Sequence, residues 1–155
     1  MVLYYLLFIN ADHQIMQNFK FNVLSDPDDH KIIRKVKGFK CPTMNKFNKN
    51  NLIILLKDVS KQNQIIGFTF ITSYEHSNLG QCLSVNFIYT FKQYRKMGYS
   101  TELIKICIDI GKEMKLNKII GFVLNGSHSL QLFKKLKFKP YRDDSDITQC
   151  YIYDL

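Results

Sequence analysis

Apolar residues in this chain either alternate with polar ones or form short runs, and the pattern predicts a mixture of strands and helices. Short apolar runs bounded by turn residues predict strands, whereas apolar residues three and four positions apart predict helices. Strands are expected, in chain order, at residues 2–9, 17–24, 52–56, 64–71, 82–90, 119–124, 138–141 and 149–153. Helices are expected at residues 27–37, 100–115 and 127–137, with a loop or a short, poorly ordered helix at 38–51.

The order of these elements predicts the fold class. Three antiparallel strands are followed by a strand–helix–strand unit, which is typical of an α/β (α+β) protein with a mixed, mostly antiparallel central sheet flanked by helices. Residues 119–124 form a nearly continuous apolar run, as expected for a parallel strand covered on both faces. We expect a single domain over residues 1–155, in which residues 1–16 add an N-terminal strand and turn.

Composition narrows the class of protein. With 46% hydrophobic and 23% charged residues, the chain has the composition of a folded domain. The longest apolar run, residues 2–9, is too short to span a bilayer, and it lacks the basic start and small-residue cleavage site of a signal peptide. We therefore expect a cytoplasmic protein with no membrane partner. The four cysteines are scattered without a Cys-x-x-Cys pair, so reduced thiols and no metal are expected.

Most of the candidate functional residues lie within residues 88–101. An apolar strand ends at Thr90, a tight basic turn holds Arg95 and Gly98, and an amphipathic helix begins near Ser100. A helix start leaves backbone N–H groups unpaired, and together with the helix dipole these groups favour an anion such as a diphosphate. Glycine has no Cβ, so Gly98 lets a ligand approach the backbone closely.

Two motifs in the chain resemble one family. The spacing Arg95-x-x-Gly98-x-Ser100 resembles the coenzyme A loop of the GCN5-related N-acetyltransferases, Gln/Arg-x-x-Gly-x-Gly/Ala, except that Lys96 stands where a second Gly is common. Residues 132–138, Leu-Phe-Lys-Lys-Leu-Lys-Phe, resemble the family's Leu-Tyr-Glu-Lys-x-Gly-Phe segment, with Phe133 at the Tyr and Lys137 at the Gly.

The resemblance implies the acetyltransferase fold, acetyl-CoA as cosubstrate, and direct transfer of acetyl to a small amine in a ternary complex. The sequence shows no recognisable pair of a Cys beside a His, so a covalent acyl-enzyme is less favoured than direct transfer. Carried over position by position, the family's coenzyme-binding residues are Ile88, Tyr89, Thr90, Arg95, Lys96, Met97, Gly98, Tyr99, Ser100, Thr101, Ser129 and Phe133.

The resemblance also points to two departures at the catalytic positions. The family's carboxylate base falls near Asn86, and its Tyr acid is Phe133; an amide cannot accept the amine's proton, and a phenyl ring cannot donate one. Asn86 is expected to hold water or substrate, and His128 is the favoured substitute for proton transfer, with Glu75 and His76 as alternatives. A protein that binds acyl-CoA without efficient catalysis also fits.

The acceptor is left open. A net charge of +9 suits an anionic amine such as glucosamine 6-phosphate, but the Glu-Asp pair of those enzymes reads Asn86-Phe87 here. The charge equally fits a Lys-rich surface with no role in recognition. Transfer to a protein, peptide or polyamine amine is the alternative within the family. A nucleic-acid-binding module built on the basic, aromatic segment 37–49 is a disfavoured alternative from another class, because it matches no RNA-binding signature. A homodimer is expected if the outer strands pair across subunits.

Overall fold

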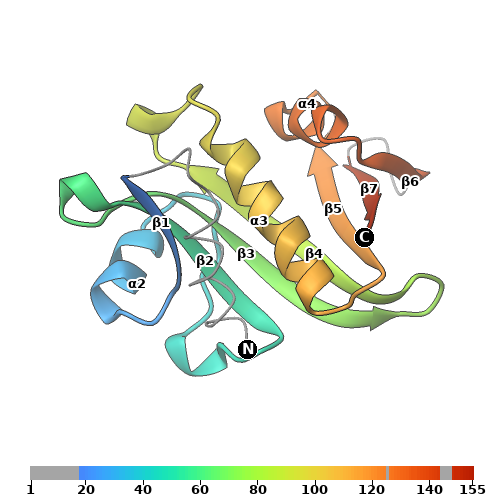
Figure 1. Ribbon diagram of the computed structural model, residues 1–155, viewed down its shortest axis with the longest axis horizontal. Coiled ribbons are helices and arrows are strands. Elements are labelled where there is room, and N and C mark those ends of the chain that lie inside the picture. Colours follow the sequence, from blue (N-terminus) through green and yellow to red (C-terminus); the bar gives the residue numbers. More distant parts are fainter. Residues whose placement is uncertain (1–17, 125, 144–147) are drawn as a thin grey trace.

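A seven-stranded sheet runs through the computed structural model, which describes residues 18–124, 126–143 and 148–155 (Figure 1). The strands are β1 (Phe19–Val23), β2 (Asn51–Asp58), β3 (Gln64–His76), β4 (Gly80–Thr90), β5 (Lys118–Leu124), β6 (Lys139–Asp143) and β7 (Thr148–Asp154). Their order in the sheet is β1-β2-β3-β4-β5-β7-β6. Only β4 and β5 pair in parallel, whereas every other neighbouring pair is antiparallel. The expected mixed, mostly antiparallel sheet is confirmed.

Within the described residues, three α-helices cover the two faces of this sheet. They are α2 (Pro27–Ile33), α3 (Tyr99–Glu113) and α4 (His128–Lys135). The helices α3 and α4 lie on one face, where they pack on apolar residues from β2 to β5, while α2 packs on the opposite face near β2 and β3 (Figure 1). Alternate residues of β2 divide between the two cores: Ile54 and Leu56 face α3, whereas Ile53 and Leu55 face α2. This division follows from the two-residue period of a strand.

Most element boundaries lie within a few residues of the sequence prediction, and the ends of the first helix and of β3 differ most. Asp26 caps α2 by accepting a hydrogen bond from the Asp28 N–H at 2.8 Å, as its position before Pro27 predicts. The helix ends at Ile33 rather than at residue 37. Beyond Ile33 the chain continues in short turns, and these turns bury Val36 and Phe39 in the core beneath α2. The burial of these two side chains overrides the helical pattern.

The other helices and the long hairpin differ by a few residues from the prediction. Helix α3 begins at Tyr99, one residue before the expected start, and α4 begins at His128 with Ser127 as its cap. Strand β3, which was expected to end at residue 71, continues to His76, because β3 and β4 pair as far as His76 and Gly80. The strand and turn expected within residues 1–16 lie outside the described residues.

A β-bulge in β4 positions the candidate site. Phe87 pairs with Phe70, but the next pair joins Val85 to Ile71, so Asn86 is an extra residue in β4. An extra residue bends its strand and increases its local twist. The bulge lies just past the last pair between β4 and β5, which joins Val85 to Gly121. Beyond this point the two parallel strands diverge.

Candidate active site

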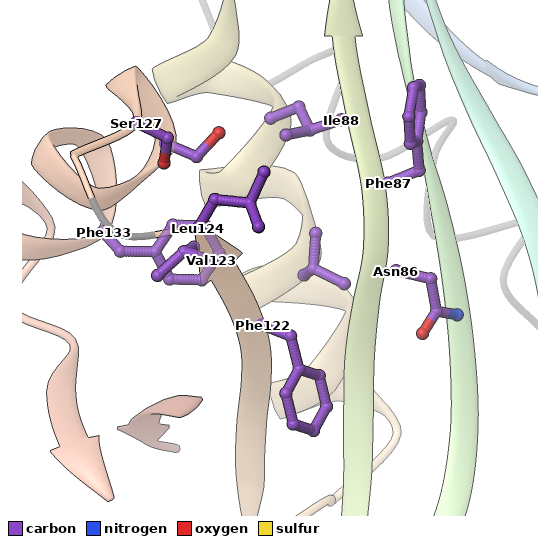
Figure 2. A pocket seen from close by; sticks show the side chains of 10 residues that line it. Asn86, Phe87, Ile88, Phe122, Val123, Leu124, Ser127 and Phe133 are labelled. Carbon is purple, nitrogen blue, oxygen red and sulfur yellow. The ribbon is translucent and has the colours of Figure 1, made fainter. Parts of the chain in front are cut away.

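The divergence of β4 and β5 opens a cavity of about 190 Å³. Figure 2 shows this cavity between the two strands, with Ile88 on one side, Val123 and Leu124 on the other, and α4 above. The lining residues are Val85, Asn86, Phe87, Ile88, Phe122, Val123, Leu124, Ser127, Ser129 and Phe133. Strand β4 has lost its neighbour here, so backbone groups on the β5 side of Asn86–Thr90 have no strand partner on that side. They are available to an extended ligand.

The loop from Phe91 to Gly98 leads from the end of β4 to α3, and two side chains fasten it. The Arg95 Nε donates a hydrogen bond to the Thr90 carbonyl at 3.1 Å, and its guanidinium lies 5.5 Å from the centroid of the Tyr89 ring. The buried Tyr94 hydroxyl donates to Gln64 Oε1 at 2.9 Å, which ties the loop to β3. The side chain of Arg95 therefore orders the loop.

The backbone of the loop has the geometry of an anion site. Gly98 adopts φ 86°, and a Cβ built on it would meet nothing within 4 Å, so the space above it is open. Within the described part of the chain, the N–H groups of residues 96–100 donate no backbone hydrogen bond, whereas the Thr101 N–H bonds to the Gly98 carbonyl at 2.9 Å. These N–H groups at the positive end of the α3 dipole suit a diphosphate.

Lys96 and Ser100 show how the chain departs from the common motif without changing the loop. Lys96 has φ 63°, so a lysine adopts the left-handed conformation in which glycine is common. Ser100 lies inside the first turn of α3, and its hydroxyl shares a 3.0 Å hydrogen bond with the Thr90 hydroxyl. The Ser100 side chain thus joins the helix start to the end of β4, and Gly98 occupies the capping position.

Asn86 lies at the bulge and lines the cavity (Figure 2). Its amide Nδ2 donates to Thr72 Oγ1 at 2.9 Å, and its Oδ1 accepts from the Ser84 hydroxyl at 2.8 Å. These two bonds fix the orientation of the amide while leaving the side chain exposed to solvent. The position therefore provides a held polar group beside the cavity, with no carboxylate.

Phe133 closes the inner end of the cavity from α4. Its ring is buried, packs edge-on against Phe138 with the ring centroids 4.5 Å apart, and lies directly over Gly121. A Cβ at Gly121 would come within 2.0 Å of the Phe133 ring, so the ring occupies the space that glycine leaves open. Lys137, just after α4, has φ 66° and keeps the left-handed backbone of a glycine position. Ser129 also lines the cavity.

The three candidate substitutes for proton transfer lie elsewhere. His128 is the first residue of α4, is exposed, and does not line the cavity. Glu75 is exposed on β3, and His76 at the end of that strand contacts the rings of Tyr74 and Tyr141, each at 6.3 Å between centroids. The cavity lining that the structure describes therefore holds no group that titrates near neutral pH.

The cysteines do not offer a nucleophile. Burial raises the pKa of Cys107 to about 12, and its thiol donates to the Leu103 carbonyl at 3.1 Å. Burial also raises the pKa of Cys82 and of the half-buried Cys41, so both thiols are protonated at neutral pH. No disulfide forms between cysteines of the described chain.

Two further findings concern the described residues as a whole. They contain no group of three or more His, Cys, Asp or Glu side chains that could hold a metal ion. No helix within ranges 18–124, 126–143 and 148–155 is long and apolar enough to cross a bilayer.

Some lining residues escaped the sequence analysis. Phe122, Leu124 and Ser127 lie on β5 and at the start of α4, between the two recognised motifs. In the structure, apolar residues at the end of β5 alternate between exposed and buried. No signal in the sequence indicated this, because a continuous apolar run does not show which of its residues are exposed.

Comparison with known proteins identifies similar molecules. A model of the acetyltransferase (GNAT) family matches residues 17–138. No curated protein matches the chain in sequence. Among solved structures, the NatC complex bound to Gag peptide and CoA contains a chain with 16% identity and a TM-score of 0.74, and the match covers 90% of this chain and 99% of that one.

Two further structures share the fold. NAA60 from Arabidopsis thaliana in complex with acetyl-CoA is 15% identical, with a TM-score of 0.72, and the match covers 88% of this chain and 98% of that one. The spermidine/spermine N-acetyltransferase SpeG from Vibrio cholerae, in mutant form, is 14% identical, with a TM-score of 0.65, and the match covers 88% and 94%.

Proposed function

This chain belongs to the acetyltransferase (GNAT) family, and from that premise we propose that it transfers the acetyl group of acetyl-CoA to a primary amine. The observation that carries the proposal is the order of two features along β4: the cavity between β4 and β5 is lined as far as Ile88, and the strand then leads through Thr90 to the loop whose N–H groups suit a diphosphate. Acetyl-CoA has a diphosphate at one end of its pantetheine arm and a thioester at the other. The loop and the open edge of β4 match these two parts in order along the chain.

The proposed reaction is direct transfer. The amine nitrogen attacks the thioester carbon, a C–N bond forms and the C–S bond breaks, while the amine loses a proton and the thiolate gains one. Residues Ile88, Tyr89 and Thr90 hold the pantetheine through their backbone, and residues 95–101 hold the diphosphate. Ser129 and Phe133 border the arm from α4. Positioning of the two reactants supplies most of the acceleration.

Proton transfer is proposed to go through water that Asn86 helps to hold. The Asn86 amide is neutral, and the described lining contains no general base to replace it. Because Phe133 has no hydroxyl, the leaving thiolate takes its proton from solvent. The His128 role remains a prediction, which His128→Gln tests: a large loss of kcat would identify His128 as the base. Because His128 lies outside the lining, we expect this variant to keep kcat within about twofold.

The comparison structures leave several acceptors open. One was solved with a peptide, and SpeG acetylates spermidine and spermine. Glucosamine 6-phosphate, which the net charge of +9 favoured, has no counterpart among these similar structures. The acceptor is therefore proposed at the level of a primary amine. A cytoplasmic location and a homodimer remain predictions, and sedimentation of the purified chain tests the dimer.

A matched pair of glycine variants tests the proposed coenzyme site. Gly98 and Gly38 both have positive φ, 86° and 84°, and a Cβ at either would meet nothing within 4 Å. Gly98→Ala and Gly38→Ala should therefore strain the backbone equally, by about 1 kcal/mol. We expect acetyl-CoA to raise the Tm of the unmodified protein and of Gly38→Ala, and to raise that of Gly98→Ala much less. Equal shifts in both variants, or no shift in the unmodified protein, would contradict the proposal.

A further inference from the structure

The cavity beside the proposed thioester position is lined without charge. Its described lining comprises seven apolar side chains, two serines and Asn86, and contains no Asp, Glu, Lys, Arg or His. A buried or half-buried charge on a ligand needs an opposite charge or several hydrogen bonds to offset its loss of water. The described lining therefore suits neither the phosphate of a sugar phosphate nor the several ammonium groups of a polyamine.

Strand β5 presents apolar side chains to solvent at this cavity. Ile119 and Val123 are buried in the core beneath α3 and α4, so the alternate residues Phe122 and Leu124 point to the other face of the sheet. Phe122 is 53% exposed and Leu124 is 57% exposed. An exposed strand face in a sheet with one solvated side usually carries polar residues. Two large apolar residues here, beside the fork of the strands, form a surface that the described residues leave exposed, and exposed apolar groups beside a cavity suit the binding of an apolar ligand.

Strand β4 completes this surface from the opposite side. Phe87 contributes to the lining, and its ring stacks on Phe39 on the α2 face of the sheet, with the ring centroids 4.7 Å apart. Asn86 precedes it and is oriented by Thr72 and Ser84. Figure 2 shows the Asn86 amide on the far side of β4 from Phe122 and Leu124, so the polar group and the apolar side chains lie on opposite sides of the fork. An amine at the open edge of β4 therefore has an apolar surface of β5 next to it.

We infer that the acceptor of this enzyme is a primary amine with an apolar substituent close to its nitrogen, and that Phe122 and Leu124 contact this substituent. The inference rests on the proposed acetyl transfer and names its substrate class. The same chemistry occurs in the first residue of a peptide that begins with an apolar amino acid and in a free alkyl or arylalkyl amine. The two sources differ only in the atoms beyond this apolar substituent, where a peptide continues and a free amine ends.

Matched acceptors test the inference. Four tetrapeptide amides that differ only in the first residue, which is Leu, Ser, Asp or Arg, are compared with leucinamide, phenethylamine, spermidine and glucosamine 6-phosphate by release of free CoA. We expect kcat/KM for the Leu peptide, for leucinamide or for both to exceed that of each charged acceptor by about tenfold or more. Comparison of the Leu peptide with leucinamide distinguishes a peptide acceptor from a free amine. The peptide should have the higher kcat/KM only if the enzyme also contacts residues beyond the first.

Variants connect the preference to β5. Phe122→Ala and Leu124→Ala remove exposed side chains, so the fold should be kept, and each should lower kcat/KM for the apolar acceptor by about tenfold while changing that for the Ser peptide little. Val59→Ala is the control, since Val59 is 47% exposed and lies outside the cavity. A charged acceptor preferred over the apolar ones, or unchanged selectivity in both β5 variants, would overturn the inference. So would no reaction with any apolar acceptor; a Tm shift with acetyl-CoA would then show that only the acceptor class, and not the coenzyme site, is wrong.

Discussion

Lys96 holds a backbone conformation that costs an L-amino acid stability. Its φ of 63° lies in the left-handed region, and its side chain is exposed. We expect Lys96→Gly to raise the free energy of unfolding by about 0.5–1 kcal/mol, because glycine adopts this conformation without strain. Thermal unfolding of Lys96→Gly and Lys96→Ala separates strain from charge: both variants lose the ammonium group, but only the glycine variant should gain stability. An equal change in both would assign the effect to charge.

The buried Cys107 thiol should make the free energy of unfolding depend on pH in the alkaline range. Burial raises the pKa of its thiol from 9.0 to about 12, so between these values the unfolded chain loses a proton that the native protein keeps. Stability should therefore fall as pH rises above 9, by up to about 1.4 kcal/mol for each pH unit. Urea unfolding at pH 8 and pH 10.5 checks this. Cys107→Ala should start less stable and lose less over the interval; parallel losses in the two proteins would argue against this pKa.

At the scale of single residues, the sequence predicted the parts of the site that are local in the chain. Arg95, Gly98 and Ser100 lie within one strand–turn–helix, and this local context, together with their spacing, indicated an anion-binding loop, which remains a prediction. The surroundings of Asn86 were not predictable in this way. Its partner Thr72 comes from another strand, and only the pairing of β3 with β4 brings the two side chains together.

Among the elements, α4 and β5 fit together through one pair of residues. The Phe133 ring lies over Gly121, and a Cβ at Gly121 would be 2.0 Å from the ring. We expect Gly121→Ala to lower the free energy of unfolding by about 1–3 kcal/mol through overpacking. A smaller side chain should relieve the clash, so the double variant Gly121→Ala with Phe133→Leu should lose less than the sum of the single losses. Chemical denaturation of the four proteins measures this coupling, and simple additivity would mean that the two residues do not compete for space.

The pattern of apolar residues predicted every described strand and α-helix, but it missed two features of these elements. Helix α2 is shorter than its pattern, because Val36 and Phe39 reach the core from turns. The bulge at Asn86 was also invisible. Residues 87–89 are all apolar, so the sequence around them shows no break in alternation that would place an extra residue.

For the whole molecule, the net charge of +9 bears on how acetyl-CoA is captured. Lys92 and Lys96 are exposed on the coenzyme loop, and acetyl-CoA is anionic. Raising the salt concentration from about 0.05 M to about 0.5 M should therefore increase the KM for acetyl-CoA severalfold, because exposed charges are screened. Steady-state kinetics with an acceptor whose single charge is its amine give the control, since the KM of that acceptor should change much less than the KM of the multiply charged coenzyme. A KM for acetyl-CoA that is independent of salt would remove any role of the surface charge in coenzyme binding.

At this largest scale, net charge gives less information about function than the order of the elements does. The overall fold followed from the order of elements, and the family from two motifs. Net charge suggested an anionic acceptor, although charge counted over a whole chain does not say where it lies. The described cavity lining is uncharged, and that fact required the positions of Phe87, Phe122 and Leu124 in three dimensions.

The extra residue in β4 has a consequence for how the chain tolerates a change in length. If Asn86 were deleted, Val85 would be followed directly by Phe87, and every later side chain of β4 would still point to the face that it occupies now. The shortened strand would be regular and free to run alongside β5 past Gly121. We expect this one-residue deletion to fold with nearly normal stability and to lose acetyl-CoA binding, which thermal unfolding with and without the cosubstrate would reveal. At this point of the chain, the number of residues matters more to activity than to folding.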